Sequence, residues 1–324
     1  MQALITGVGG FVGHHLAVYL AQYADLKLYG SVFEPVSTHQ ALQNATGITL
    51  QQVDLRDAEA VYALIEAAHP DFIFHLAALA SVGRSWQHPW ETIGNNVQAQ
   101  LNILQALAAM AMRPRMLIIG SADQYGLVHP DENPISEDTP FRPNSPYSVS
   151  KIAQEMLGRQ YFYSHQIPVI CVRPFNHIGP GQRQQFVVPD FASQIAKAEA
   201  GLIPPVMSVG NLDAQRDFTD VRDVVCAYYL AITRGTPGAV YNIGSGKAHS
   251  IRALLDTLLD LSDTDITVKH DPRRMRPSDV PRMVCDARRL YTDTGWQPKI
   301  AFEQSLSDVL NEWRQRVTTD SIDT

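Results

Sequence analysis

A glycine-rich segment near the start of the chain constrains the fold more than any other feature of the sequence. Residues 6–13 read Thr-Gly-Val-Gly-Gly-Phe-Val-Gly, between an apolar run, Ala3–Thr6, and a segment with helical spacing, Phe11–Tyr23. A short buried strand, a glycine turn and a helix in this order are typical of the first unit of a dinucleotide-binding sheet. The sequence therefore predicts a parallel sheet that begins with this unit.

The same segment predicts the residues that hold a dinucleotide's pyrophosphate. Gly7 allows a tight turn, Gly10 lets the backbone approach the phosphates, and Gly13 lets the helix pack on the strand. Phe11 and Val12 open the helix, whose free N–H groups and positive dipole end favour an anion. We expect these five residues to form the phosphate end of a cofactor site.

Asp54 follows the third predicted strand and is a candidate contact for the adenine. Its carboxylate can accept from an adenine amine, and we expect Leu55 beside it to contact the cofactor as well. The alternative for Asp54 is an N-cap of the helix that follows, because a short carboxylate suits that position. Asp57 is better placed for the cap, so we favour the ligand contact for Asp54.

The fourth predicted strand, Asp71–Leu76, ends in residues with small side chains. Ala77 and Ala78 leave space for the body of a cofactor, and we expect Leu76 to lie against it. His75 lies in an apolar setting, where a lone histidine is more often a core residue than a catalyst.

Strands alternate with helices through the first half of the chain, which predicts an α/β fold with a doubly wound parallel sheet of the Rossmann type. Residues 116–119, Met-Leu-Ile-Ile, are apolar at every position, as expected for a strand covered by helices on both faces. The remaining predicted strands and helices share this alternation: strands Leu26–Val32, Ile48–Val53, Arg115–Gly120 and Pro168–Val172, and helices Ala58–Ala68, Trp90–Met110 and Pro146–Ser164.

The local composition of the sequence changes after Arg173. Glycine and proline become dense in Pro174–Gly181 and in Gly201–Gly210. We expect a dinucleotide-binding domain over residues 1–173, joined by about 221–245, which holds a helix and a strand. Residues 174–220 and 246–324 are then expected to form a smaller C-terminal substrate lobe over the carboxyl ends of the strands, where open α/β sheets bind ligands.

Composition excludes several other classes of protein. The 324 residues carry a formal net charge of -7 and no basic block, which argues against nucleic-acid binding. No apolar run approaches the ~20 residues that span a bilayer, and the N-terminus has no signal-peptide pattern. We therefore expect no membrane partner. The three cysteines form no disulfide or zinc pattern, so we expect no metal and a cytoplasmic location.

A tyrosine and a lysine four residues apart carry the predicted chemistry. Tyr147 and Lys151 lie on one face of the helix Pro146–Ser164. The ammonium is expected to lower the pKa of the phenol toward working pH, so that Tyr147 exchanges a proton with a carbonyl or alcohol oxygen. Lys151 is also expected to hold the nicotinamide ribose. Ser121, at the end of the fifth strand, is expected to orient the reacting oxygen.

These motifs together resemble the extended short-chain dehydrogenase/reductase family that acts on nucleotide sugars. The resemblance runs almost end to end, and its last blocks are most similar to the GDP-mannose branch, in particular to its GDP-6-deoxy-D-mannose reductases. The segments that carry it are Thr6–Gly13, His75–Ala78, Gly120–Gly126, Ser145–Lys151, Arg173–Gln182, Val209–Asp223, Arg276–Pro281 and residues 295–298.

The resemblance implies roles for residues of the second lobe. Asn176 is expected to bind the sugar or the diphosphate, and Arg216 and Arg276 to neutralise the diphosphate, since a planar guanidinium suits phosphate oxygens. Asp123 is expected to contact the sugar. The alternative for the arginines is a salt bridge, for which Asp217 and Asp279 are the partners.

Within this branch the segment before Tyr125-Gly126 favours a reductase over a dehydratase. Dehydratases of the family place a hydroxyl or carboxyl residue and then a glutamate there, and the glutamate serves as acid and base at C5 and C6. This chain has Ala122 and Asp123 there. Ala122 lacks the polar group, and Asp123 has a shorter side chain than glutamate. The resemblance then implies reduction of the C4 ketone of GDP-4-keto-6-deoxy-D-mannose to a GDP-6-deoxyhexose, with GDP-D-rhamnose as the expected product.

Three other functions stay open at this point. They are a GDP-mannose 4,6-dehydratase, a nucleotide-sugar 4-epimerase and a non-catalytic dinucleotide sensor. The sensor ranks last because such modules lose the Tyr/Lys pair, which this chain keeps.

The sequence allows either NADPH or NADH as the cofactor. No arginine follows the second predicted strand, and Glu34, about 20 residues past the loop, can bind a ribose 2′-hydroxyl. The two long helices, Trp90–Met110 and Pro146–Ser164, are expected to pair with their symmetry mates in a homodimer, as in relatives.

Overall fold

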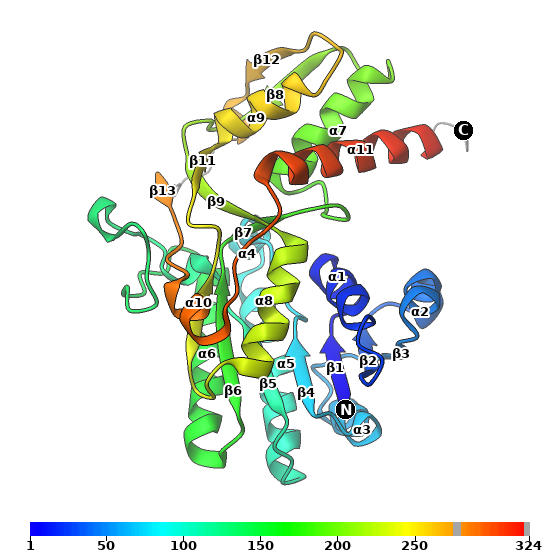
Figure 1. Ribbon diagram of the computed structural model, residues 1–324, viewed down its shortest axis with the longest axis vertical. Coiled ribbons are helices and arrows are strands. Elements are labelled where there is room, and N and C mark those ends of the chain that lie inside the picture. Colours follow the sequence, from blue (N-terminus) through cyan, green and yellow to red (C-terminus); the bar gives the residue numbers. More distant parts are fainter. Residues whose placement is uncertain (275–279, 321–324) are drawn as a thin grey trace.

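The computed structural model describes residues 1–274 and 280–320. Its larger part is built on a seven-stranded sheet with the order β10-β6-β5-β4-β1-β2-β3 (Figure 1), and every pairing in it is parallel. The order reverses direction between β1 and β4, and ligands of open α/β sheets bind at such a switch point. The strands are β1 (Gln2–Thr6), β2 (Lys27–Val32), β3 (Thr49–Gln52), β4 (Phe72–His75), β5 (Arg115–Ile119), β6 (Val169–Pro174) and β10 (Val240–Ile243).

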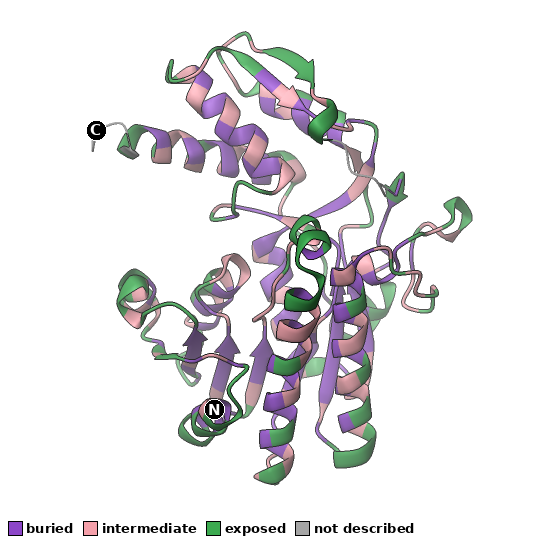
Figure 2. Cartoon of the chain, turned by 180° about the vertical axis from the view of Figure 1, so that it is seen from behind, coloured by how far each residue is buried: buried purple, intermediate pink, exposed green. Residues whose placement is uncertain are grey.

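Helices cover both faces of this sheet, as predicted for a doubly wound fold. One core lies under α1, α2, α8 and α10, and the other under α3, α5 and α6, so the inner strands are buried on both sides (Figure 2), whereas the edge strand β3 is largely exposed. Asp57 caps α3 by accepting from the N–H groups of Glu59 and Ala60, as expected from the sequence. The helices are α1 (Phe11–Leu20), α2 (Gln40–Thr46), α3 (Ala58–Ala68), α4 (Val82–Gln87), α5 (Pro89–Ala109), α6 (Pro146–His165), α8 (Val221–Arg234) and α10 (Arg288–Thr294).

A smaller lobe stands beyond the carboxyl ends of the strands (Figure 1). Its core is formed by α7, α9 and α11 together with strands of two small sheets, β7 with β11-β9-β13 and β12-β8. The helix α7 was not among the elements predicted from the sequence. The bounds are β7 (Asn176–Ile178), α7 (Val187–Glu199), β8 (Val206–Val209), β9 (Gln215–Asp220), β11 (Ala248–Ser250), α9 (Ile251–Asp260), β12 (Thr267–His270), β13 (Arg282–Met283) and α11 (Phe302–Asp320).

Residues 1–274 and 280–320 also contain short 3-10 helices: η1 (Val36–His39), η2 (Ala122–Gln124), η3 (Pro130–Glu132) and η4 (Pro272–Arg274). In the part of the chain that the structure describes, no helix is long and apolar enough to span a membrane. Among the same residues, no group of three or more histidines, cysteines and carboxylates could hold a metal ion.

Candidate active site

The glycine turn after β1 lies directly against the end of β4. Gly7 has φ +69°, and a Cβ on it would come within 2.8 Å of the Ala77 Cα. A Cβ on Gly13 would come within 2.6 Å of the Gly7 carbonyl oxygen, so helix α1 approaches the turn as closely as its backbone allows. Leu76, Ala77 and Ala78 are half-buried beside this turn. The structure therefore brings the two predicted cofactor segments together at the switch point of the sheet.

The first turn of α1 is shaped for an anion. Gly10 is the N-cap residue and has no side chain with which to cap the helix, and no acidic residue lies in the first turn. Phe11 and Val12 are half-buried, and the Phe11 ring stacks on His177 at a centroid distance of 6.1 Å and an interplanar angle of 9°. An uncapped N-terminus beside a turn that admits no Cβ fits the pyrophosphate of a dinucleotide.

Asp54 and Leu55 both make contacts within the protein. The Asp54 carboxylate accepts from Arg56 Nε at 3.0 Å and from Arg56 Nη2 at 2.6 Å, and these hydrogen bonds hold the pKa of Asp54 below its usual value. The Leu55 side chain is buried in the core under α3 and α5, and its carbonyl oxygen accepts from Asn102 Nδ2 at 2.9 Å. A contact to the cofactor from Leu55 would have to come from its backbone.

Ser121, Tyr147 and Lys151 meet in a buried site at the carboxyl end of β5. All three are less than a tenth exposed, and a hydrogen bond joins Tyr147 to Ser121. Lys151 Nζ lies 5.9 Å from the centroid of the Tyr147 ring and donates to the Ile119 carbonyl oxygen at 2.9 Å. The turn after one strand thus supplies the serine, and a single helix face supplies the phenol and the amine.

Burial sets the protonation of this group. It raises the pKa of Tyr147, the nearby Asp123 carboxylate raises it further, and the hydrogen bond to Ser121 opposes both effects. The prediction that this pKa is lowered toward working pH is therefore wrong for the structure, because desolvation of the phenolate and the Asp123 carboxylate raise it. At neutral pH Tyr147 is a protonated donor, which is the form that a ketone reduction requires.

Lys151 is affected in the opposite direction, since burial lowers its pKa to about 7. Burial and the Lys151 charge together lower the pKa of His75 to about 3. His75 is therefore neutral, and it shares a hydrogen bond with Thr6 Oγ1 at 2.9 Å. It is the buried core histidine that the sequence predicts.

The shift at Lys151 predicts how stability depends on pH. The folded protein without cofactor releases this proton near pH 7, whereas the unfolded chain holds it to about 10.5. The unfolded state binds more protons between these values, so the free energy of unfolding is expected to rise with pH by up to about 1.4 kcal/mol per unit. Denaturation at pH 7 to 9.5 checks this: Lys151→Met should remove the rise, and Lys299→Met, at an exposed lysine, should keep it. Equal slopes in wild type and Lys151→Met would contradict the assignment.

The predicted substrate residues lie on the lobe side of this site. Asp123 Oδ2 is 3.3 Å from Ser121 Oγ, and Asn176 is exposed at the start of β7. Arg216, on β9, donates to the Val280 carbonyl oxygen at 2.7 Å. Arg276 lies outside the described residues.

Asp217, the possible ion-pair partner of Arg216, is a buried carboxylate with a structural function. It accepts from the N–H groups of Ser245, Gly246 and Cys285 at 2.7, 2.8 and 3.0 Å. It thereby ties β9 to the segments that follow β10 and β13.

Sequence reasoning missed the buried amides that support the site. Asn96 of α5 accepts from the Leu79 N–H at 2.7 Å and donates to Ser150 Oγ at 3.0 Å, which fastens the segment after β4 to α6. Gln124 is also fully buried and bonds to the backbone of Ser121. A polar residue in an apolar helical stripe is the available signal for Asn96, and no pattern in the sequence marks Gln124.

Comparison with known proteins places this site in a family. The family described as GDP-mannose 4,6 dehydratase matches residues 4–309, which include both lobes. The chain belongs to this family. Its curated relatives include the GDP-6-deoxy-D-mannose reductase of Pseudomonas aeruginosa, which is 37% identical over 313 residues and 97% of each chain.

Solved structures of similar proteins share the architecture over nearly the whole chain. RMD from Pseudomonas aeruginosa, complexed with NADPH, is 36% identical with a TM-score of 0.86, over 97% of this chain and 99% of that one. UDP-glucose 4-epimerase from Thermus thermophilus, in complex with NAD, is 28% identical with a TM-score of 0.83 and the same coverage. The resemblance noted from the sequence motifs is thus confirmed at the level of the family.

Proposed function

We propose that this protein is an NAD(P)H-dependent oxidoreductase that reduces the C4 ketone of GDP-4-keto-6-deoxy-D-mannose to GDP-D-rhamnose. The observation that carries the proposal is the buried Ser121–Tyr147–Lys151 group at the carboxyl end of β5, in the same sheet as the glycine turn that follows β1. The relative at 37% identity is named a GDP-6-deoxy-D-mannose reductase, and the solved relative at 36% binds NADPH. Three free cysteines fit a reducing compartment, and we place the enzyme in the cytoplasm.

The residues of the site divide the chemistry between them. A bound reduced nicotinamide supplies the hydride. Tyr147, protonated because it is buried, donates its phenolic proton to the C4 oxygen as negative charge develops there. Ser121 donates a hydrogen bond to the same oxygen and sets its orientation. Lys151 lies beside the phenol, where its proton can stabilise the charge left on Tyr147.

The smaller lobe is proposed to hold the nucleotide diphosphate. Residues 174–220 and 246–324 would supply it, over a cofactor domain formed by 1–173 and about 221–245. Arg216 would bind a phosphate oxygen, Asn176 the sugar or the diphosphate, and Asp123 the sugar. Gly7, Gly10, Gly13, Ala77 and Ala78 would bind the cofactor.

Product analysis tests the proposal directly. The protein is incubated with GDP-4-keto-6-deoxy-mannose and NADPH or NADH, and the product is identified by NMR. GDP-D-rhamnose is expected, and GDP-6-deoxy-talose would correct the stereochemistry. Conversion of GDP-mannose to a 4-keto sugar without added reductant would show a dehydratase, and tightly copurified NAD would favour an epimerase. Ala122 and Asp123, in place of the dehydratase residues, favour the reductase.

Glu34 is expected to discriminate between the two cofactors. It follows β2, its side chain is 55% exposed, and its Oε2 lies 3.8 Å from His39 Nε2, while the His39 ring lies against Gly9 of the glycine turn. A carboxylate at this position accepts from a ribose hydroxyl and repels a 2′-phosphate. Glu34→Gln is therefore expected to lower the NADPH Kd relative to the NADH Kd by roughly tenfold. Fluorescence titration measures both constants, with Glu66→Gln on the outer side of α3 as the control; an unchanged ratio would exclude the role.

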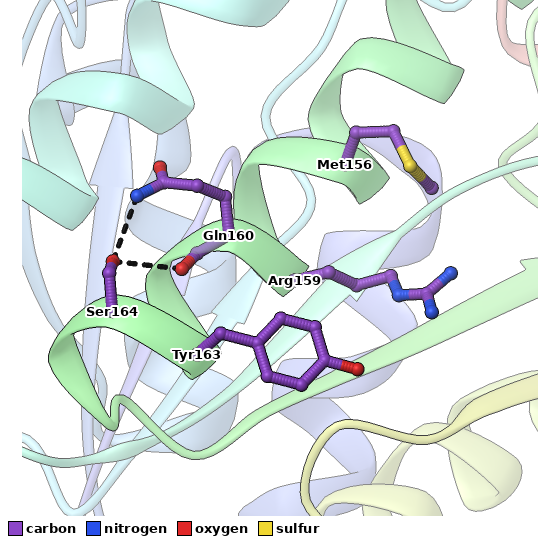
Figure 3. A pocket seen from close by; sticks show the side chains of 5 residues that line it. All are labelled: Met156, Arg159, Gln160, Tyr163 and Ser164. Atoms are coloured by element: carbon purple, nitrogen blue, oxygen red, sulfur yellow. Dashed lines mark hydrogen bonds between the residues drawn. The ribbon is translucent and has the colours of Figure 1, made fainter.

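We further propose that the protein is a homodimer formed through α5 and α6. Val149, Met156 and Tyr163 recur every seven residues on α6 and are 44%, 40% and 70% exposed. Met156 and Tyr163 line a hollow in this surface with Arg159, Gln160 and Ser164 (Figure 3). An apolar stripe along one helix suits a self-complementary two-fold contact.

A charge in this stripe is expected to separate the subunits. Met156→Glu should shift the mass measured by sedimentation from dimer to monomer, because a carboxylate would be buried against its symmetry copy. Tyr62→Glu, at a 43% exposed aromatic on α3, should leave the dimer intact. A monomeric wild-type protein would contradict the proposal.

A further inference from the structure

Gln124 holds the turn that carries Ser121. It ends η2, the 3-10 turn after β5, and is fully buried. Its Oε1 accepts from the Ser121 N–H at 2.7 Å, and its Nε2 donates to Glu155 Oε2 at 2.9 Å. The carboxamide also lies against Gly120, where any Cβ would overlap its oxygen. Both ends of this side chain are thus fixed.

Glu155 connects this contact to the helix that carries the phenol. Tyr147, Lys151 and Glu155 are spaced by four residues and share one face of α6. The Glu155 carboxylate is immobilised by Arg173, whose Nε and Nη2 donate to it at 2.8 and 2.6 Å. Gln124 is therefore a side-chain link between the serine turn and the tyrosine helix.

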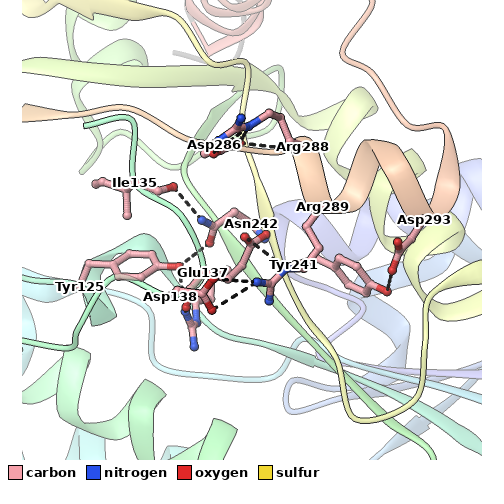
Figure 4. A network of polar contacts seen from close by, with 11 residues as sticks. Tyr125, Ile135, Glu137, Asp138, Tyr241, Asn242, Asp286, Arg288, Arg289 and Asp293 are labelled. Carbon is pink, nitrogen blue, oxygen red and sulfur yellow. Dashed lines mark hydrogen bonds and ion pairs between the residues drawn. The ribbon is translucent and has the colours of Figure 1, made fainter. Parts of the chain in front are cut away.

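A wider network of polar contacts continues from Arg173, and Figure 4 shows its part around Tyr125, Asn242 and Glu137. Arg173 Nη1 donates to Tyr125 Oη at 2.8 Å, and Tyr125 donates to Asn242 Oδ1 at 2.6 Å. The Asn242 N–H in turn donates to Glu137 Oε1 at 2.8 Å. Arg173, which these partners hold, thus restrains the carboxylate that accepts from Gln124.

We propose that Gln124 is a positioning residue for the reduction: it sets the distance between Ser121 Oγ and Tyr147 Oη, so that both reach one ketone oxygen. The inference rests on the proposed function. A carboxamide accepts from a backbone N–H at one end and donates to a carboxylate at the other, whereas an ionised carboxylate can only accept. A leucine would leave the Ser121 N–H and Glu155 without this partner, and a glutamate would set one carboxylate against another.

The test compares Gln124→Leu, Gln124→Glu and wild type in the reduction of the 4-keto sugar. Gln124→Leu is expected to lower kcat by ~10 to 100-fold, with the KM for the sugar and the NADPH Kd within about threefold, because neither ligand touches Gln124. Gln124→Glu lacks the Nε2 donor to Glu155, and it regains a donor at this place when its own carboxyl is protonated. The ratio of its kcat to that of wild type is therefore expected to rise several-fold as the pH falls from 8 to 5.5.

Gln100→Leu is the matched control. Gln100 is also fully buried, on α5, and donates to the Gln154 carbonyl oxygen at 2.6 Å, so its loss should lower the Tm without changing kcat more than about twofold. A Gln124→Leu protein with a lowered Tm and an unchanged kcat would overturn the proposal. If Gln124→Leu does not fold, the proposal would be overturned by a ratio of Gln124→Glu kcat to wild-type kcat that does not change with pH. Wild-type protein that binds NADPH but reduces no 4-keto sugar would overturn the proposed function instead.

Discussion

Tyr147→Phe is expected to lower kcat for the 4-keto sugar by ~10³-fold or more, which is within the range for loss of a general acid. Phenylalanine keeps the buried ring but removes the phenolic hydroxyl that a hydrogen bond joins to Ser121. The Kd of NADPH should stay within about twofold, since the glycine turn and the first turn of α1 are untouched. Steady-state kinetics and fluorescence titration measure the two effects.

Tyr161→Phe is the control for this substitution. Tyr161 lies on the same helix, is 8% exposed and stacks on His165 at a centroid distance of 4.8 Å, away from the serine turn. Its variant should keep wild-type turnover. A Tyr147→Phe enzyme that retains more than a tenth of its activity would show that another group protonates the product.

Arg173→Leu is expected to lower the free energy of unfolding by ~3–5 kcal/mol, the usual cost of leaving one member of a buried ion pair alone. Arg173 and Glu155 are only 4% and 1% exposed and share two short hydrogen bonds. The guanidinium also packs over the Phe141 ring, 4.5 Å from its centroid. Denaturation in urea, with the slope m compared between proteins, measures the loss.

Arg314→Leu gives the matched comparison on the surface. Arg314 makes a similar two-bonded pair with Glu199, but the two side chains are 36% and 18% exposed. Solvent screens such a pair, so its loss should cost about 1 kcal/mol or less. If both variants lose the same stability, burial does not control the strength of these pairs.

Most of the larger domain follows from local patterns. The inner strands after the glycine turn are short, mostly apolar runs, and β5 is apolar on both faces, so helix–strand alternation was sufficient to predict the doubly wound sheet. The helix α7 was missed because its flanks are rich in glycine and proline. Its partners α9 and α11 are distant in the sequence, and contacts with them stabilise a helix that local spacing does not mark.

Only part of the chemistry of the site could be predicted from the sequence, for a similar reason. Residue type and spacing identified Ser121, Tyr147 and Lys151, because a turn after a parallel strand and a helix face are local features. Which way the pKa of Tyr147 moves depends on how much water and which charges surround it, and these come from separate elements. The same holds for Gln124, whose partner Glu155 lies on α6, far from it in the sequence.

The sequence by itself determined the alternation of strands and helices in the larger domain, the anion-binding turn and the types of residue that can transfer a proton. The tertiary structure alone decided that the phenol stays protonated and that a buried amide joins the serine turn to the tyrosine helix. Desolvation and hydrogen bonding act between groups that are close in space, and no local pattern records that closeness.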